Sequence, residues 1–174
     1  KKIMGFELSG KTLGIIGVGN IGSRVGKIAY YGFGMRVLGY RRRLNLIEKP
    51  IIPTDLETLL RESDIISIHL PLTAETRKFI DEKKMSLMKN GVFIVNTSRM
   101  EIMDLEALLK AIQSGKVGGF AADTNLKLEH PKINELLSYP NVLLAPHIGA
   151  QTIEAQRRAA EYIARSIVER TPPE

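Results

Sequence analysis

The chain has 174 residues, 44% of them hydrophobic and 25% charged, with a formal net charge of +6. It has no cysteine, which excludes disulfides, thiolate nucleophiles and cysteine–metal sites, and we expect no metal centre. No apolar run reaches membrane-spanning length, and basic residues do not alternate with aromatic ones, so we expect neither a membrane nor a nucleic-acid partner. The N-terminus has no signal-peptide core, so a cytoplasmic location is the expectation.

Short apolar strands alternate with amphipathic helices along the chain. We predict strands over Thr12–Gly17, Arg36–Tyr40, Ile65–Leu70, Val92–Asn96, Gly119–Ala122 and Val142–Ala145. We predict helices over Ile21–Tyr31, Asp55–Glu62, Asp81–Met88, Asp104–Ser114, around Ile133–Leu137, and over Thr152–Arg170. Uniformly apolar strands are typical of parallel strands that are covered on both faces. The pattern therefore predicts a single α/β domain with a doubly wound parallel sheet.

A glycine-rich turn follows the first predicted strand and opens the first predicted helix. It reads Gly17-Val18-Gly19-Asn20-Ile21-Gly22. Such glycines permit a tight turn and let a pyrophosphate approach backbone amides at the positive end of a helix. A turn without a ligand is the alternative, but the succession of strand, turn, helix and strand favours a dinucleotide site in a Rossmann fold.

Three consecutive arginines, Arg41 to Arg43, follow the second predicted strand. Sites that prefer NAD usually place an acidic residue there to bind the ribose 2′-hydroxyl. A guanidinium instead suits a 2′-phosphate. A solvated charge run is the alternative, but we expect Arg41 and Arg42 to bind cofactor and NADP to be preferred over NAD.

Two further candidate residues come just after predicted strands. Arg99 follows the fourth strand, where a surface ion pair with Glu101 is the alternative to a ligand contact. His147 follows the sixth strand between Pro146 and Ile148-Gly149, where a purely structural histidine is the alternative. Loops that leave the carboxyl ends of parallel strands carry ligands in such sheets.

In their order, these motifs closely resemble the nucleotide-binding domain of the D-isomer-specific 2-hydroxyacid dehydrogenases, from about Leu8 to Arg170. The matching segments are Leu8–Gly14, Gly17–Gly22, Phe33–Met35, His69–Thr73 with Glu75 and Thr76, Asn96–Arg99, Asp104–Leu108, Ala122–Asp123 and Pro146–Gly149. The resemblance implies hydride transfer between a nicotinamide cofactor and a D-2-hydroxy or 2-keto acid, in a homodimer. A dinucleotide-sensing interaction module, like the corepressors of the family, is the alternative.

The resemblance also implies roles for single residues. Arg99 would bind the carboxylate and carbonyl of a 2-keto acid, His147 would exchange a proton with the substrate oxygen, and Asp123 would orient the nicotinamide carboxamide. Together with the glycine turn and the arginine run, the predicted cofactor-binding residues are Gly17, Gly19, Asn20, Ile21, Gly22, Arg41, Arg42, Leu70, Pro71, Thr97, Ser98, Asp123 and Gly149.

Three departures from the family bear on activity. The family's catalytic glutamate falls on Leu128, so that Glu129, one position later, is the candidate replacement, with a solvated loop residue as the alternative. Met100 stands where the family has glycine, and we expect it either to reshape the substrate pocket or to be a harmless packing change. The segments that build the family's substrate domain have no counterpart in residues 1–174, so we expect a cofactor-binding fragment with little activity alone.

Overall fold

The computed structural model describes residues 5–124 and 130–170. Seven parallel strands form one sheet in these residues, in the order β3-β2-β1-β4-β5-β6-β7. The strands are β1 (Thr12–Ile16), β2 (Arg36–Tyr40), β3 (Ile52–Pro53), β4 (Ile65–Ile68), β5 (Val92–Asn96), β6 (Val117–Asp123) and β7 (Val142–Ala145). The predicted doubly wound sheet is confirmed, but the predicted six strands lack β3, an exposed two-residue edge strand that is too short to show a periodic pattern.

The direction of strand addition reverses at β1. Ile16, at the carboxyl end of β1, pairs with Tyr40 of β2 on one side and with Ile68 of β4 on the other. Strands β2 and β3 are therefore added on one side of β1, and β4 to β7 on the other side. The loops after β1 and β4 leave the carboxyl ends of these strands in opposite directions. This is the topological switch point at which open parallel sheets bind ligands.

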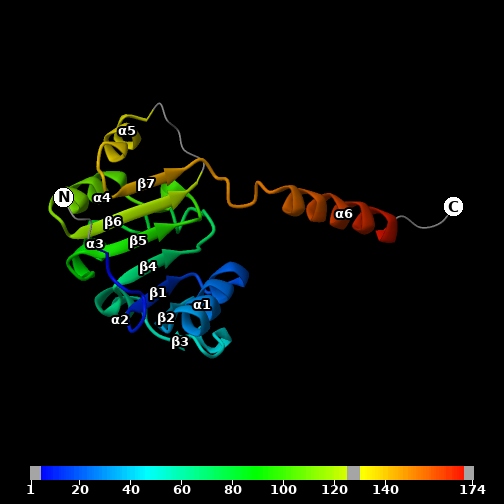
Figure 1. Cartoon of the computed structure of the whole chain (residues 1–174), viewed down its shortest axis with the longest axis horizontal. Helices are drawn as coiled ribbons and strands as arrows, with labels where there is room; N and C mark the ends of the chain where they lie inside the picture. Colours follow the sequence, from blue (N-terminus) through cyan, green and yellow to red (C-terminus); the bar gives the residue numbers. More distant parts are fainter. Residues whose placement is uncertain (1–4, 125–129, 171–174) are drawn as a thin grey trace.

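Helices connect successive strands (Figure 1). They are α1 (Asn20–Phe33), α2 (Leu56–Glu62), α3 (Glu82–Leu87), α4 (Leu105–Gln113), α5 (Pro131–Leu137) and α6 (Ile153–Arg170), with short 3₁₀ turns η1 (Leu44–Leu46) and η2 (Met100–Ile102). Asp55, Asp81 and Asp104 are N-caps whose carboxylates accept the first amides of α2, α3 and α4. The predicted helices thus begin at their caps, one residue before the first helical residue.

Two hydrophobic clusters lie on the opposite faces of the sheet. Because successive strand residues point to opposite faces, Ile15 and Ile16 of β1 join different clusters, and both are fully buried. The smaller cluster includes Ala29 of α1, whereas the larger one includes residues of α2 to α5, such as Leu59 and Leu108. Strand β1 is therefore buried on both faces, as a uniformly apolar strand predicts. On β5 and β7 one face is more open, since Phe93 and Leu143 are exposed.

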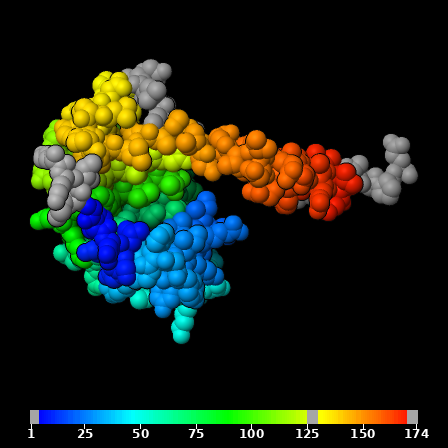
Figure 2. Space-filling model, in the orientation of Figure 1, coloured from blue at the N-terminus to red at the C-terminus, as the bar shows by residue number. Residues whose placement is uncertain are grey.

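Helix α6 projects away from the sheet (Figures 1 and 2). Its large apolar side chains are exposed, from Ile153, which is 85% exposed, to Val168, which is 75% exposed. Across the described residues, no helix combines the length and the apolar character needed to cross a membrane.

Candidate cofactor cleft and catalytic loops

A cleft of about 590 Å³ lies at the carboxyl ends of β1, β2 and β4. Its walls come from the glycine turn after β1, the arginine run after β2 and the loop after β4. Six of the predicted cofactor-binding residues line it: Gly17, Gly19, Arg41, Arg42, Leu70 and Pro71. Residues from three separate parts of the chain therefore meet at the switch point.

The glycine turn is tight at Gly17 and open at Gly19. Gly17 has a φ of +101°, and a Cβ there would lie 2.7 Å from the carbonyl oxygen of His69, so only glycine fits between β1 and β4. Gly19, the N-cap of α1, faces open space. No side chain caps α1 and no acidic residue lies in its first turn, so its first amides and its dipole remain available to an anion.

The other predicted residues of the turn lie at the beginning of α1. Asn20 and Ile21 are its first two residues, and Ile21 is 65% exposed. Gly22 is buried against the turn, because a Cβ there would lie 2.4 Å from the carbonyl oxygen of Gly17. The amides of Asn20 and Ile21 thus belong to the first turn of α1, where backbone amides have no acceptor within the helix, while Gly22 serves close packing.

The arginine run forms one wall of the cleft. Arg41 donates a long hydrogen bond of 3.4 Å from Nη1 to the carbonyl oxygen of Leu46. Arg42 forms an ion pair with Glu75, which belongs to the loop after β4 and also lines the cleft. Two guanidinium groups of the run therefore have contacts around the cleft, although both contacts are exposed to solvent, and cofactor binding by Arg41 and Arg42 stays a prediction.

Buried Asn96 shapes the loop that carries Arg99. Its side-chain amide donates to the carbonyl oxygen of Arg99 at 3.0 Å, and its Oδ1 accepts the amide of Ser98 at 2.9 Å. The Ser98 hydroxyl donates to the carbonyl oxygen of Ile68. Arg99 is exposed, and its Nη1 donates to the carbonyl oxygen of Ser98 at 2.8 Å, so the alternative ion pair with Glu101 does not form.

His69 connects the ends of β4 and β5. Its Nε2 lies 2.8 Å from the hydroxyl of Ser67, and its Nδ1 lies 3.3 Å from the hydroxyl of Thr97, a predicted cofactor-binding residue. Burial lowers the pKa of His69. Sequence reasoning did not select His69 or Asn96 as site residues, although both stand in the motifs that carry the resemblance.

Asp123, at the end of β6, holds the loop of His147. Its Oδ1 accepts the amide of Ile148 at 2.8 Å, and its Oδ2 accepts the amide of Gly149 at 2.7 Å. The amide of Ile148 is the main cause that lowers the pKa of Asp123, and the charge of His147 contributes. A Cβ on Gly149 would lie 2.9 Å from Oδ2, which explains the glycine there.

The backbone of His147 is held in an unusual conformation, with a φ of +60° in the left-handed region. Such strain persists where the surroundings enforce it, and it is concentrated at functional sites. Because β5, β6 and β7 are parallel neighbours, Arg99 and His147, on the loops after β5 and β7, lie at the same edge of the sheet as Asp123, the last residue of β6. Glu129 lies outside the described residues.

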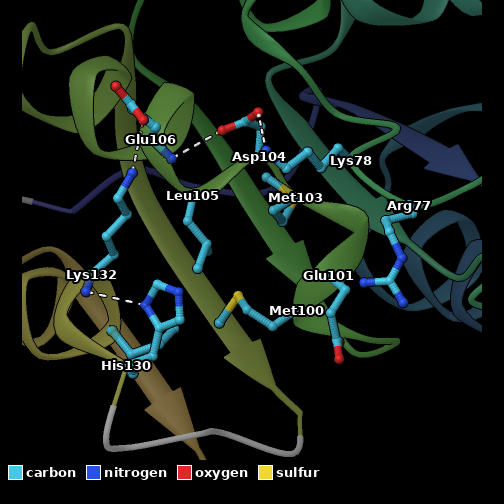
Figure 3. A pocket seen from close by; sticks show the side chains of 11 residues that line it. Arg77, Lys78, Met100, Glu101, Met103, Asp104, Leu105, Glu106, His130 and Lys132 are labelled. Carbon is cyan, nitrogen blue, oxygen red and sulfur yellow. Dashed lines mark hydrogen bonds and ion pairs between the residues drawn. The ribbon is translucent and has the colours of Figure 1, made fainter.

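Met100 points away from the cofactor cleft. It is only 5% exposed, and it lines a separate cavity of about 290 Å³ together with Met103, Leu105 and Ile133 (Figure 3). Ion pairs surround this cavity, including Lys132 with Glu106 at 2.8 Å. Met100 is therefore a buried residue of the larger hydrophobic cluster, and its effect on a substrate pocket stays a prediction.

Within residues 5–124 and 130–170, no three His, Asp or Glu side chains gather in a group that could hold a metal ion. Arg99, His147 and Asp123 bring a guanidinium, an imidazole and a carboxylate to this edge of the sheet. These are groups that bind an anion, exchange a proton and fix a loop.

The sequence and the fold both match known proteins. Residues 1–149 match the model of the D-isomer specific 2-hydroxyacid dehydrogenase NAD binding domain. Hydroxypyruvate reductase of Thermotoga maritima is 45% identical over 171 residues, which are 96% of this chain and 55% of the relative. Glyoxylate reductase of Thermococcus litoralis is 45% identical over 169 residues, which are 95% of this chain and 50% of the relative.

Solved structures agree. D-lactate dehydrogenase of Aquifex aeolicus, complexed with NAD and lactic acid, is 38% identical with a TM-score of 0.84, covering 95% of this chain and 54% of that one. D-2-hydroxyisocaproate dehydrogenase is 32% identical with a TM-score of 0.89, and the match covers 96% of this chain and 55% of that one. The chain spans about half the length of the curated relatives it matches. From its motifs, its fold and this match over residues 1–149, the chain belongs to the D-isomer specific 2-hydroxyacid dehydrogenases, with the NAD binding domain of that family.

Proposed function

We propose that this chain binds a nicotinamide dinucleotide and positions it for hydride transfer between a D-2-hydroxy acid and the 2-keto acid. One observation carries the proposal: residues predicted to bind cofactor, from the loops after β1, β2 and β4, line one cleft at the uncapped start of α1. The open space at Gly19 leaves room for a pyrophosphate against the helix. The enzyme names of the relatives favour this function over the interaction module.

In this mechanism, each residue acts on the substrate or holds a group that does. The nicotinamide, when bound, supplies or accepts the hydride. Arg99 binds the substrate carboxylate and polarises the carbonyl, for which its exposed fork of donors suits it. His147 gives a proton to the oxygen that forms, or takes it in the oxidation. Asp123 keeps the His147 loop in place through two amides and orients the carboxamide.

The cofactor preference is a finer part of the proposal. Arg41 lines the cleft after β2, where a guanidinium attracts a 2′-phosphate, so NADP is bound more tightly than NAD. Thr97 and Ser98 contribute to the groove beside β5, and Ser98 is held in place by Asn96.

The proposal also includes the class of substrate and the oligomeric state. The substrate is a small 2-keto acid of the glyoxylate or hydroxypyruvate type, after the names of the relatives. Residues 1–174 act as the dinucleotide-binding domain of a cytoplasmic homodimer. A second region, which corresponds to the other half of the relatives, closes the cleft and excludes water from Arg99 and His147.

The helix-start site is tested with Gly19→Asp. Aspartate is a good N-cap, so α1 remains folded, but its carboxylate occupies the amides and repels a pyrophosphate. We expect titration calorimetry with NADH and NADPH to give binding to the original chain and at least about tenfold weaker binding to Gly19→Asp. Gly5→Asp, at another glycine in open space, is the matched control and leaves both affinities unchanged. If the original chain binds neither dinucleotide, the proposal is wrong.

A further inference from the structure

The fold brings an acidic residue, Glu75, into the cleft beside the arginines that follow β2, where no acidic residue stands in the sequence. Arg41 follows β2 at the position of the usual acid, yet Glu75, 33 residues beyond Arg42, reaches the same cleft from the loop after β4. Its carboxylate pairs with the guanidinium of Arg42. The ribose end of the cleft therefore contains one carboxylate among three arginines.

A contribution to folding stability does not by itself explain the ion pair between Arg42 and Glu75. The side chains of Arg42 and Glu75 are 78% and 71% exposed, and exposed pairs contribute little to folding. The turn beneath Glu75 is nevertheless well defined. Buried Thr76 donates from Oγ1 to the carbonyl oxygen of Pro71 at 2.6 Å and accepts the amide of Thr73 at 2.7 Å. A firmly held turn thus presents an exposed carboxylate to the cleft, as a ligand contact requires.

The carboxylate has opposite effects on the two cofactors. It can accept a hydrogen bond from a ribose 2′-hydroxyl, as the acid after the second strand does in sites that prefer NAD. It repels a 2′-phosphate, and it also occupies Arg42, which would otherwise be a phosphate ligand. Arg41 and Arg43, which do not pair with Glu75, still attract the phosphate.

We propose that Glu75 is a cofactor-specificity residue, which replaces the missing acid after β2 and limits the NADP preference that Arg41 confers. The inference rests on the proposed function, because it needs a dinucleotide in this cleft. It assigns the balance between NAD and NADP to a contact between two loops, rather than to the residue after β2 alone.

The test compares dissociation constants of NADH and NADPH for the 174-residue chain and its variants. Glu75→Gln keeps the shape of the side chain, removes its charge and releases Arg42. We expect the ratio of the two constants to shift toward NADPH by about tenfold, the scale of a screened interaction between a unit charge and a doubly charged phosphate. Arg42→Gln leaves the Glu75 carboxylate unpaired and shifts the ratio toward NADH.

The matched control is Glu62→Gln. Glu62 also forms an exposed ion pair with an arginine, Arg36, at 2.6 Å. Arg36, however, is the first residue of β2, so this pair lies at the amino ends of the strands, away from the cleft at their carboxyl ends. This control leaves the ratio unchanged. A ratio that is unchanged in Glu75→Gln, or that shifts toward NADH, overturns the inference. Absence of binding by the unaltered chain instead overturns the proposed function, so the two failures are distinct.

Discussion

At the scale of single residues, Asp123 gives the most direct prediction. Two consecutive amides of the His147 loop donate to its carboxylate and lower its pKa. A lowered pKa means that the charged form is favoured in the folded state. The stabilisation of the loop is therefore fully present above the ordinary aspartate pKa of about 3.9 and is lost only as the pH falls through the lowered value.

We expect Asp123→Asn to move the amide resonances of Ile148 and Gly149 at neutral pH, because the amide side chain has only one oxygen to accept two bonds. Two-dimensional NMR measures these shifts. Asp55→Asn, which alters a carboxylate that caps α2 far from this loop, leaves both resonances in place. If Asp123→Asn also leaves them in place, Asp123 does not hold the loop.

His69 gives a prediction on pH. Burial lowers its pKa, so the folded state favours the neutral ring between Ser67 and Thr97. The contribution of His69 to the free energy of unfolding is fully present above about pH 6.5, the pKa of a histidine in the unfolded chain. It declines as the pH falls below that value, because the unfolded state then takes up a proton more readily than the folded state does. We expect the melting temperature to fall more between pH 7 and pH 5 in the original chain than in His69→Asn.

The control for His69 is the exposed His130, which caps α5. His130→Asn retains the decline in melting temperature between pH 7 and pH 5. Equal declines in the original chain and in His69→Asn would show that burial of His69 has no thermodynamic consequence.

At the scale of elements, Asp104 joins α4 to the segment after β4. Its Oδ1 accepts the amides of Glu106 and Ala107, and its Oδ2 lies 3.3 Å from Nζ of Lys78, whose φ is +51°. We expect Asp104→Ala to lower the free energy of unfolding by about 1–2 kcal/mol, as the loss of an N-cap does. Asp104→Asn retains the cap and loses only the exposed ion pair, so urea denaturation should show a smaller loss. Equal losses would contradict the capping role.

The helices and strands were mostly predictable because their causes are local. Apolar runs of strand length and cap residues such as Asp55 and Asp104 act within a few residues of where they stand. Strand β3 was not predictable, because Ile52 and Pro53 have no period of their own and pair only because β2 lies beside them. Met100 shows the same limit, since only the packing of α4 and α5 reveals where its side chain points.

At the scale of the whole molecule, α6 stands apart from the sheet (Figure 2). Its apolar side chains, such as Ile153 and Val168, are exposed, and a helix that buries little apolar surface is only marginally stable in water. We expect the amides of α6 to exchange with deuterium much faster than those of β1 and β4 in the 174-residue chain. Mass spectrometry or NMR measures this difference. Equal protection of α6 and β1 would show that α6 folds as one unit with the sheet.

The sequence by itself determined the doubly wound sheet, the glycine turn and the order of the strand ends that carry Arg99, Asp123 and His147, because these follow from local patterns and from strand order. Only the tertiary structure decided which side chains meet. The hydrogen bonds from the His147 loop to Asp123, and the pairing of Glu75 with Arg42, join residues that are distant in the chain. Such contacts depend on how neighbouring strands align their ends, and no local pattern records that alignment.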